Sequence, residues 1–302
     1  MLTPTRAFSA DESGIASKTL RASGSAVGSD LDQHPLVPIL ARARLALARF
    51  DSDIRDYTCL LIKRETIEGK LTPRQALRLK IREPRSNTPE GKDAETPSIA
   101  PLNPPSVAAA AYAKFLKPSS VAGREVLFVD GQMRNRMLVR RGGPRLPNLT
   151  LKVKLDSPFA AKESNHTIAN TGFRFLLREL VKRLETEVER ERCEVRFYAD
   201  AAIGKRACDH IEVRQPKRAP DLDYQLARVY VDREWNLPLY FSSYGWPVEG
   251  EEKPVLIEEY AFTQVQLNAG LTAADFDRGN PDYRFRPEDD DIPSVTVADS
   301  VR

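Results

Sequence analysis

The side chains of this chain that could support acid–base, nucleophilic or metal chemistry are its three histidines and three cysteines. Cys208, His210 and Glu212 alternate along one predicted strand, a pattern that a metal site or a thiol–imidazole pair could use. The same spacing describes one face of any strand, and a Cys–His enzyme needs partners from elsewhere in the fold. His34 begins a predicted helix, and His166 lies in a predicted loop without an obvious partner. The sequence therefore predicts no catalytic residue and no metal site.

The sequence motifs of the common enzyme classes are missing from this chain. It has no G-x-S-x-G elbow, no P-loop and no G-x-G-x-x-G after a predicted strand. We therefore expect a protein that is not an enzyme and has no cofactor. The cysteines Cys59, Cys193 and Cys208 have no metal-ligand spacing, and their odd number defines no disulfide framework. Three reduced, mostly buried thiols are favoured over one bridge with a free thiol.

One segment, residues 131–155, is strongly basic and contains no acidic residue, although the net charge of the whole chain is only +3. A solvated outer face of a sheet explains this composition. The alternative is a contact surface for a lipid head group, a membrane surface or an acidic partner protein. No nucleic-acid partner is expected, because aromatic side chains for base stacking are not interleaved with the charges. The candidate contact residues are Arg134, Arg136, Arg140, Arg141, Arg145, Lys152 and Lys154.

Residues 224–247 have the pattern of a strand, a tight turn and a second strand. β-branched and aromatic residues suit a half-buried pleated surface, and the polar run at 232–236 supplies the reversal. Core packing and a cross-strand cluster explain the aromatic residues, and the rim of a site for an amphiphilic ligand is the alternative. These aromatic residues are Trp235, Tyr240, Phe241, Tyr244 and Trp246.

The rest of the sequence divides into one central domain and two flanking segments. Residues 1–33 have almost no periodic apolar residues, so we predict that they are disordered. Residues 286–302 contain an acidic run and are predicted to be a flexible tail. Within the domain at 34–285, the proline-rich residues 84–105 form a predicted mobile insertion. No segment is as long as the roughly 20 consecutive apolar residues that a helix needs to span a bilayer. No signal peptide is visible.

The predicted domain contains two amphipathic helices and about ten or eleven strands. Apolar residues recur at helical spacing within 36–54 and 172–191. Most strands follow one another through short turns, which favours antiparallel pairing because parallel neighbours need a crossover helix. We therefore predict an α+β, mostly β fold, in which two helices lie across the concave side of a curved antiparallel sheet or incomplete β-barrel.

Several short runs carry a resemblance to a known family. They include Asp56-Tyr57-Thr58-Cys59, Lys114-Phe115-Leu116, Ile211-Glu212-Val213, Asn236-Leu237-Pro238, Tyr244-Gly245-Trp246-Pro247 and Glu258-Glu259-Tyr260. Over about residues 35–285 the chain resembles an uncharacterised bacterial domain-of-unknown-function family (DUF1571-like), whose fold is similar to that of the lipoprotein carriers LolA, LolB and RseB. The resemblance implies an apolar hollow for acyl chains, no known enzymatic activity, and a periplasmic or cell-envelope location.

Three functions are consistent with the sequence. The favoured one is a non-enzymatic carrier that binds a lipid or an acylated protein. The second is an interaction or sensor module of the cell envelope with a filled core, and the third is an unrecognised hydrolase. If the carrier hypothesis holds, apolar residues of the two helices line the cavity and two aromatic residues lie at its entrance. The predicted ligand-binding residues are Leu47, Phe50, Phe173, Leu177, Leu180, Leu184, Tyr244 and Trp246.

Overall fold

The computed structural model describes residues 15–16, 34–85, 107–144, 149–190, 193–248, 250 and 253–286. Within these residues thirteen strands make up an antiparallel sheet. The strand order is β1-β9-β10-β11-β12-β13-β2-β4-β5-β6-β7-β8, with β3 beside β2. This order does not return on itself, so the sheet is open and not closed into a barrel. The prediction of a mostly β fold around an open antiparallel sheet is confirmed, with more strands than expected and a third, four-residue helix.

The described chain falls into two compact units, and each is discontinuous in sequence. The long strands β2 and β13 contribute residues to both units. No helix in the described part of the chain is long and apolar enough to cross a membrane. Unit 1 comprises Met1–Ser52, Leu61–Arg74 and Gly172–Thr263, and unit 2 comprises Asp53–Leu60, Gln75–Thr171 and Gln264–Arg302.

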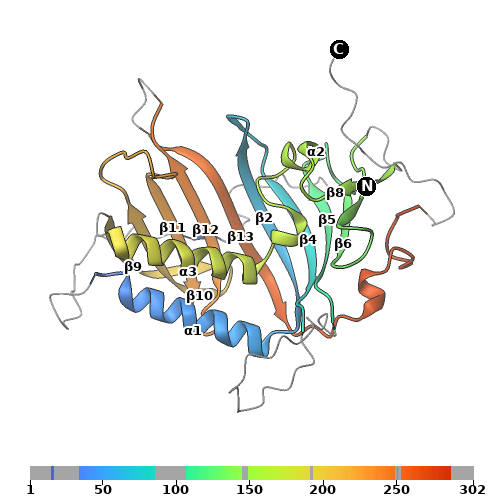
Figure 1. Ribbon diagram of the computed structural model, residues 1–302, viewed down its shortest axis with the longest axis horizontal. Helices are drawn as coiled ribbons and strands as arrows, with labels where there is room; N and C mark the ends of the chain where they lie inside the picture. The colour runs from blue at the N-terminus through green and yellow to red at the C-terminus, as the bar shows by residue number, and fades with distance from the viewer. Residues whose placement is uncertain are drawn as a thin grey trace, which may run out of the picture. The chain divides into compact units, whose positions relative to one another are not determined.

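In unit 1 two helices cover one face of the sheet, and Figure 1 shows α1 and α3 running side by side across its strands. Ion pairs Arg44–Glu185 and Asp51–Arg174 join the helices in an antiparallel arrangement. The elements are α1 (Val37–Asp53), α3 (Phe173–Arg190), β1 (Ile15–Ala16), β9 (Glu194–Ile203), β10 (Arg206–Arg214), β11 (Leu226–Asp232), β12 (Pro238–Gly245), β13 (Val255–Leu267), β2 (Asp56–Ile67) and β3 (Lys70–Leu71).

The core of unit 1 lies between these helices and the sheet. It forms because the apolar stripe of each amphipathic helix faces alternate apolar residues of the strands. Leu40 of α1 and Leu184 of α3 pack against Ile211 of β10 and Val229 of β11. On the opposite sheet face, four rings from β9 to β12 stand directly across from one another. These rings belong to Tyr198, His210, Tyr230 and Tyr240.

In unit 2 the segment that follows β13 packs across one sheet face. Its Tyr283 ring stacks on Tyr112 of β5, with centroids 3.9 Å apart, and Phe276 and Phe285 join the same cluster. A capping box of Thr272 and Asp275 begins η3. The elements are β4 (Gln75–Arg82), β5 (Ala110–Lys117), β6 (Glu125–Val129), β7 (Arg136–Arg140), β8 (Thr150–Lys154), α2 (Pro158–Ala161), η2 (Ile168–Asn170) and η3 (Ala273–Phe276).

The three segments predicted to be irregular fall mostly outside the described residues. Within 1–33 the structure describes only the short strand β1, which pairs with β9. The ends of the proline-rich insertion meet where Arg85 pairs with Val107, so the insertion leaves and re-enters the sheet at one point. Of the predicted tail at 286–302, only Arg286 is described.

Candidate functional site

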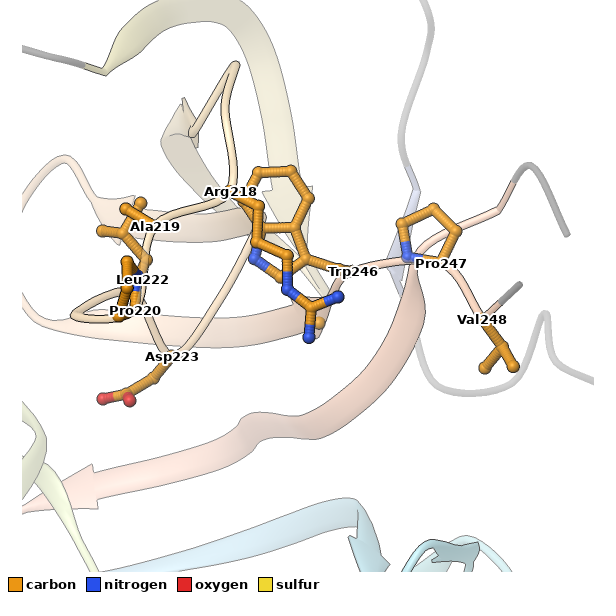
Figure 2. A pocket seen from close by; sticks show the side chains of 9 residues that line it. Arg218, Ala219, Pro220, Leu222, Asp223, Trp246, Pro247 and Val248 are labelled. Atoms are coloured by element: carbon orange, nitrogen blue, oxygen red, sulfur yellow. The ribbon is translucent and has the colours of Figure 1, made fainter. Parts of the chain in front are cut away.

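A surface hollow of about 500 Å³ lies in unit 1, where the loop between β10 and β11 faces the chain that leaves β12. Figure 2 shows Arg218, Leu222 and Asp223 on the loop, and Trp246 on the chain after β12. Small-molecule pockets are typically about 300–1,000 Å³, and the volume of this hollow falls within that range. The lining residues are Arg218, Ala219, Pro220, Leu222, Asp223, Gly245, Trp246, Pro247 and Val248.

Backbone hydrogen bonds hold the two walls of this hollow together. The Gln215 N–H donates to the Gln225 carbonyl (2.8 Å), which closes the base of the loop. The Gln225 N–H donates to the Tyr244 carbonyl (2.8 Å), which ties the loop to β12. Because β12 ends at Gly245, Trp246 leaves the sheet beside this loop. The pairing of β10, β11 and β12 therefore positions the hollow.

The walls offer a ligand several kinds of contact. The Trp246 Nε1–H is buried and has no hydrogen-bond partner among the described residues. Because this atom keeps almost no accessible surface, a ligand in the hollow would reach it only if the side chains around it moved. Arg218 supplies a cation and Asp223 an anion, while Pro220 and Pro247 supply apolar surface. This mixture suits a ligand that is both polar and apolar.

Of the predicted ligand-binding residues, Trp246 is the one that lines this hollow. Tyr244 lies on β12 beneath Arg228, with the guanidinium carbon 5.4 Å from the ring centroid. The other six lie in the helical layer, where Leu47 and Leu180 are partly buried. They are Leu47 and Phe50 on α1, and Phe173, Leu177, Leu180 and Leu184 on α3.

The helical residues at the centre of this predicted acyl site are tightly packed. The Phe173 ring centroid lies 4.6 Å from that of Phe262 and 6.4 Å from that of Phe50. Phe173 keeps 0% and Leu177 1% of its accessible surface. Since a side chain beside a water-sized void would keep accessible surface, these two contact protein atoms on all sides. An acyl chain would therefore reach them only if α3 moved, and the acyl site stays a prediction.

The predicted basic contact residues divide into several groups. The β7–β8 register places Arg136, Arg140, Lys152 and Lys154 on one face of unit 2. Arg140 is buried there and donates to the Gly123 carbonyl (2.6 Å). Arg134 is exposed in the turn before β7, Arg141 follows β7 with its N–H bonded to the Leu149 carbonyl, and Arg145 lies outside the described residues.

The Cys208, His210 and Glu212 side chains do not form a shared site. A β-bulge interrupts the register between Cys208 and His210. His210 instead stacks between Tyr198 and Tyr230, at centroid distances of 4.6 and 4.4 Å. Burial lowers the pKa of His210 to about 4 and raises the pKa of Cys208 to about 11, so both groups are neutral near pH 7.

Among the described residues, no group of three or more His, Cys, Asp or Glu side chains is arranged to hold a metal ion. The three cysteines are free thiols. His34 accepts a hydrogen bond from the Leu36 N–H at Nδ1 (3.2 Å), and its Nε2 lies 3.7 Å from the Cys193 sulfur. Because burial raises the pKa of the Cys193 thiol to about 11, this pair lacks the thiolate that a cysteine nucleophile needs.

The sequence did not identify the loop residues of the hollow, among them Arg218, Leu222 and Asp223. In a meander of antiparallel strands, alternate connections lie at the same end of the sheet. The β10–β11 connection and the β12–β13 connection are such a pair, and each contains proline. The sequence could therefore indicate that these two connections lie at the same end of the sheet. How closely they approach each other depends on the strand order.

The chain is similar to several solved structures at low sequence identity. A DUF1329 family protein from Desulfovibrio piger is 14% identical, with 80% of this chain and 97% of that chain covered and a TM-score of 0.33. The MucA/MucB complex of Pseudomonas aeruginosa is 14% identical, with 80% of this chain and 61% of that chain covered and a TM-score of 0.40. LprF from Mycobacterium bovis is 12% identical, with 78% of this chain and 95% of that chain covered and a TM-score of 0.37.

A comparison with curated proteins gives no match. The family model of DUF1571, described as a protein of unknown function, matches residues 54–285, which include most of both units. The resemblance noted in the sequence is thereby confirmed, and this protein belongs to the DUF1571 family.

Proposed function

We propose that this protein is a non-enzymatic binding protein of the cell envelope, and that it recognises a segment of a partner protein in the hollow beside Trp246. The observation that carries the proposal is the composition of the hollow. Its walls bring together the Trp246 side chain, a cation, an anion and prolines within about 500 Å³.

A polypeptide segment matches these walls better than an acyl chain does. A polypeptide offers polar backbone groups together with apolar side chains, which suits walls that are both polar and apolar. Arg218 and Asp223 can pair with charged side chains of a partner, whereas an acyl chain would leave both unpaired at a desolvation cost. Tryptophan and arginine are also the residue types that dominate binding energy at protein interfaces.

The carrier of a lipid or acylated protein is the second candidate. Its supporting observation is the apolar layer that α1 and α3 place on the sheet of unit 1. Opening that layer would expose a large apolar surface to a ligand. It would also cost the packing of Phe173 and Leu177, which the bound chain would have to replace.

A peptide selection can test the proposed site. The full chain is used to select from a displayed library of random dodecapeptides, and the affinities of enriched peptides are measured by fluorescence anisotropy. We expect Trp246→Ala to weaken binding at least tenfold, because the indole surface that lines the hollow is lost. Trp235→Phe is the matched aromatic control, because Trp235 stacks on Arg206 (3.5 Å) and does not line the hollow.

Peptides that bind the Trp246→Ala and Arg218→Ala variants as tightly as the wild type would rule out the hollow as the binding site. Native mass spectrometry of the chain purified gently from its host tests the carrier candidate in parallel. A stoichiometric lipid that stays bound to the Trp246→Ala variant would favour the carrier over the interaction module. Cell fractionation of the host checks the proposed envelope location.

A further inference from the structure

The loop between β10 and β11 forms one wall of the hollow and has little packing of its own. It comprises residues 216–223, called the β10–β11 loop below, and five of these residues line the hollow. Six of its eight residues are exposed, so the loop buries too little side-chain surface to fix its own position. Its position must therefore be set by the residues at its two ends and by the elements beside it.

Both ends of the β10–β11 loop are attached to one carboxylate of α3. Gln215, just before the loop, donates from Nε2 to Glu187 Oε2 (2.6 Å). Tyr224, just after the loop, donates from its hydroxyl to Glu187 Oε1 (3.0 Å). All three residues are buried, and Gln215 keeps 1% and Glu187 4% of its accessible surface. One glutamate therefore joins the two ends of the loop through both of its oxygens.

The same end of α3 makes two further contacts with this part of the chain. Arg190, three residues after Glu187, pairs with Asp221 in the middle of the loop (3.0 Å). Arg183, four residues before Glu187, lies over the Tyr224 ring, with its guanidinium carbon 5.9 Å from the ring centroid. Residues three and four positions apart are neighbours on a helix surface, so these three side chains lie on one side of α3.

The packing of α3 alone does not explain a glutamate at position 187. Glu187 is one of the buried residues of this helix together with Leu177 and Leu184, where an amphipathic helix ordinarily carries an apolar residue. A buried carboxylate costs desolvation free energy, which its hydrogen bonds offset. Burial and the neighbouring charge of Glu187 raise the pKa of Tyr224, so its hydroxyl keeps the proton that it donates.

We propose that Glu187 is the positioning residue of the hollow, because it holds both ends of the β10–β11 loop and so forms the wall opposite Trp246 before a partner segment binds. This inference rests on the proposed function, in which the hollow binds that segment. A wall that is already ordered lowers the entropy cost of binding. If the loop were released, only the fraction of molecules with the wall in place could bind, and the apparent affinity would fall by that fraction.

Trp246 can report the position of the loop without any ligand. The chain has two tryptophans, so Trp235→Phe leaves Trp246 as the sole indole, and acrylamide quenching of its fluorescence measures its accessibility. We expect Glu187→Leu in this background to raise the quenching constant roughly twofold, because the released loop uncovers the hollow. Glu187→Gln keeps a hydrogen-bonding side chain and should stay near the parent value. Glu189→Leu, at an exposed position of the same helix, is the matched control and should not change the constant.

A folded Glu187→Leu protein with the parent quenching constant would overturn the proposal. Far-UV circular dichroism checks that each variant folds. If Glu187→Leu does not fold, Tyr224→Phe takes its place, because this change removes one of the two hydrogen bonds and keeps the ring. Its quenching constant should rise by less than that expected for Glu187→Leu, and an unchanged constant would overturn the proposal in the same way.

The fluorescein-labelled dodecapeptides selected with the full chain separate this inference from the proposed function. We expect Glu187→Leu to weaken their binding roughly tenfold and Glu187→Gln to leave it within about twofold. Peptides that Trp246→Ala weakens and Glu187→Leu does not would overturn the inference alone, since the hollow would then bind without this attachment. Peptides that Trp246→Ala leaves unchanged would overturn the proposed function, and the quenching of Trp246 would still decide whether Glu187 positions the loop.

Discussion

At the scale of single residues, His210 is a side chain that could carry out chemistry but is packed between aromatic rings. His210 is held as a neutral ring between Tyr198 and Tyr230. Its Nε2 atom is buried without a hydrogen-bond partner among the described residues. Glu212, paired with Arg228 (2.9 Å), is the nearby carboxylate. Burial outweighs the attraction of Glu212 for a proton, so the pKa of His210 falls to about 4.

This low pKa predicts that stability depends on pH. Because His210 has a pKa of about 4 when folded and 6.5 as a free group, the unfolded chain binds more protons between these values. The free energy of unfolding should therefore fall as pH decreases from about 6.5 to about 4, by about 1–2 kcal/mol after allowance for partial exposure. Urea unfolding of the wild type and His210→Phe across this range measures the difference.

The His210→Phe variant keeps the ring stack and should lose this part of the pH dependence. His166→Phe serves as the control for the loss of a histidine outside the stack, because His166 lies in a loop. An identical slope in the wild type and His210→Phe would contradict a buried, neutral His210.

At the scale of elements, α3 decides between a carrier and a filled interaction module. Its apolar stripe faces the sheet of unit 1, and ion pairs of Glu185 and Arg174 hold it against α1. Leu177, near the middle of that stripe, is fully surrounded by protein atoms. A larger side chain at this position therefore has no space to occupy unless the helix moves.

We expect Leu177→Trp to destabilise the protein by about 1–3 kcal/mol, because overpacking forces strained rotamers and backbone shifts. Chemical denaturation with far-UV circular dichroism measures the change. Arg178→Trp is the matched control, because Arg178 is the exposed neighbour on the same helix and should change stability by less than about 0.5 kcal/mol. A folded Leu177→Trp protein of wild-type stability would reveal space beside α3 and would favour the carrier.

At the scale of the whole molecule, each compact unit has its own apolar cluster, and the thiols are distributed between them. Cys59 is buried in unit 2, and Cys208 is buried in unit 1. Cys193, also in unit 1, is partly exposed. Since all three are free, the described structure relies on apolar packing and strand pairing and not on a disulfide.

Thiol titration checks this arrangement. Ellman's reagent at pH 8 should react with the native protein slowly and at Cys193 alone, because its pKa of about 11 leaves little thiolate. The denatured chain should show all three thiols. Reductant should leave Tm unchanged, and Cys193→Ser should remove the native reaction. A Tm that falls in dithiothreitol would instead indicate a disulfide.

Much of the fold could be predicted from local patterns. The helix expected at 172–191 is α3, Phe173–Arg190, and the helix expected at 36–54 is α1, Val37–Asp53. Periodic apolar residues mark these elements because one face of each must be buried. The two-residue strands β1 and β3 and the four-residue helix α2 were missed, since such short segments have no period to detect.

The sequence by itself determined the class of this protein: its two long helices, most of its strands, its antiparallel sheet and its DUF1571 membership. These follow from residue types and spacings that are local along the chain. Only the tertiary structure decided that Trp246 meets Arg218 in a hollow, and that the chain at Arg286 meets β8. Both depend on strand order and side-chain packing, which join residues far apart in sequence and leave no local pattern.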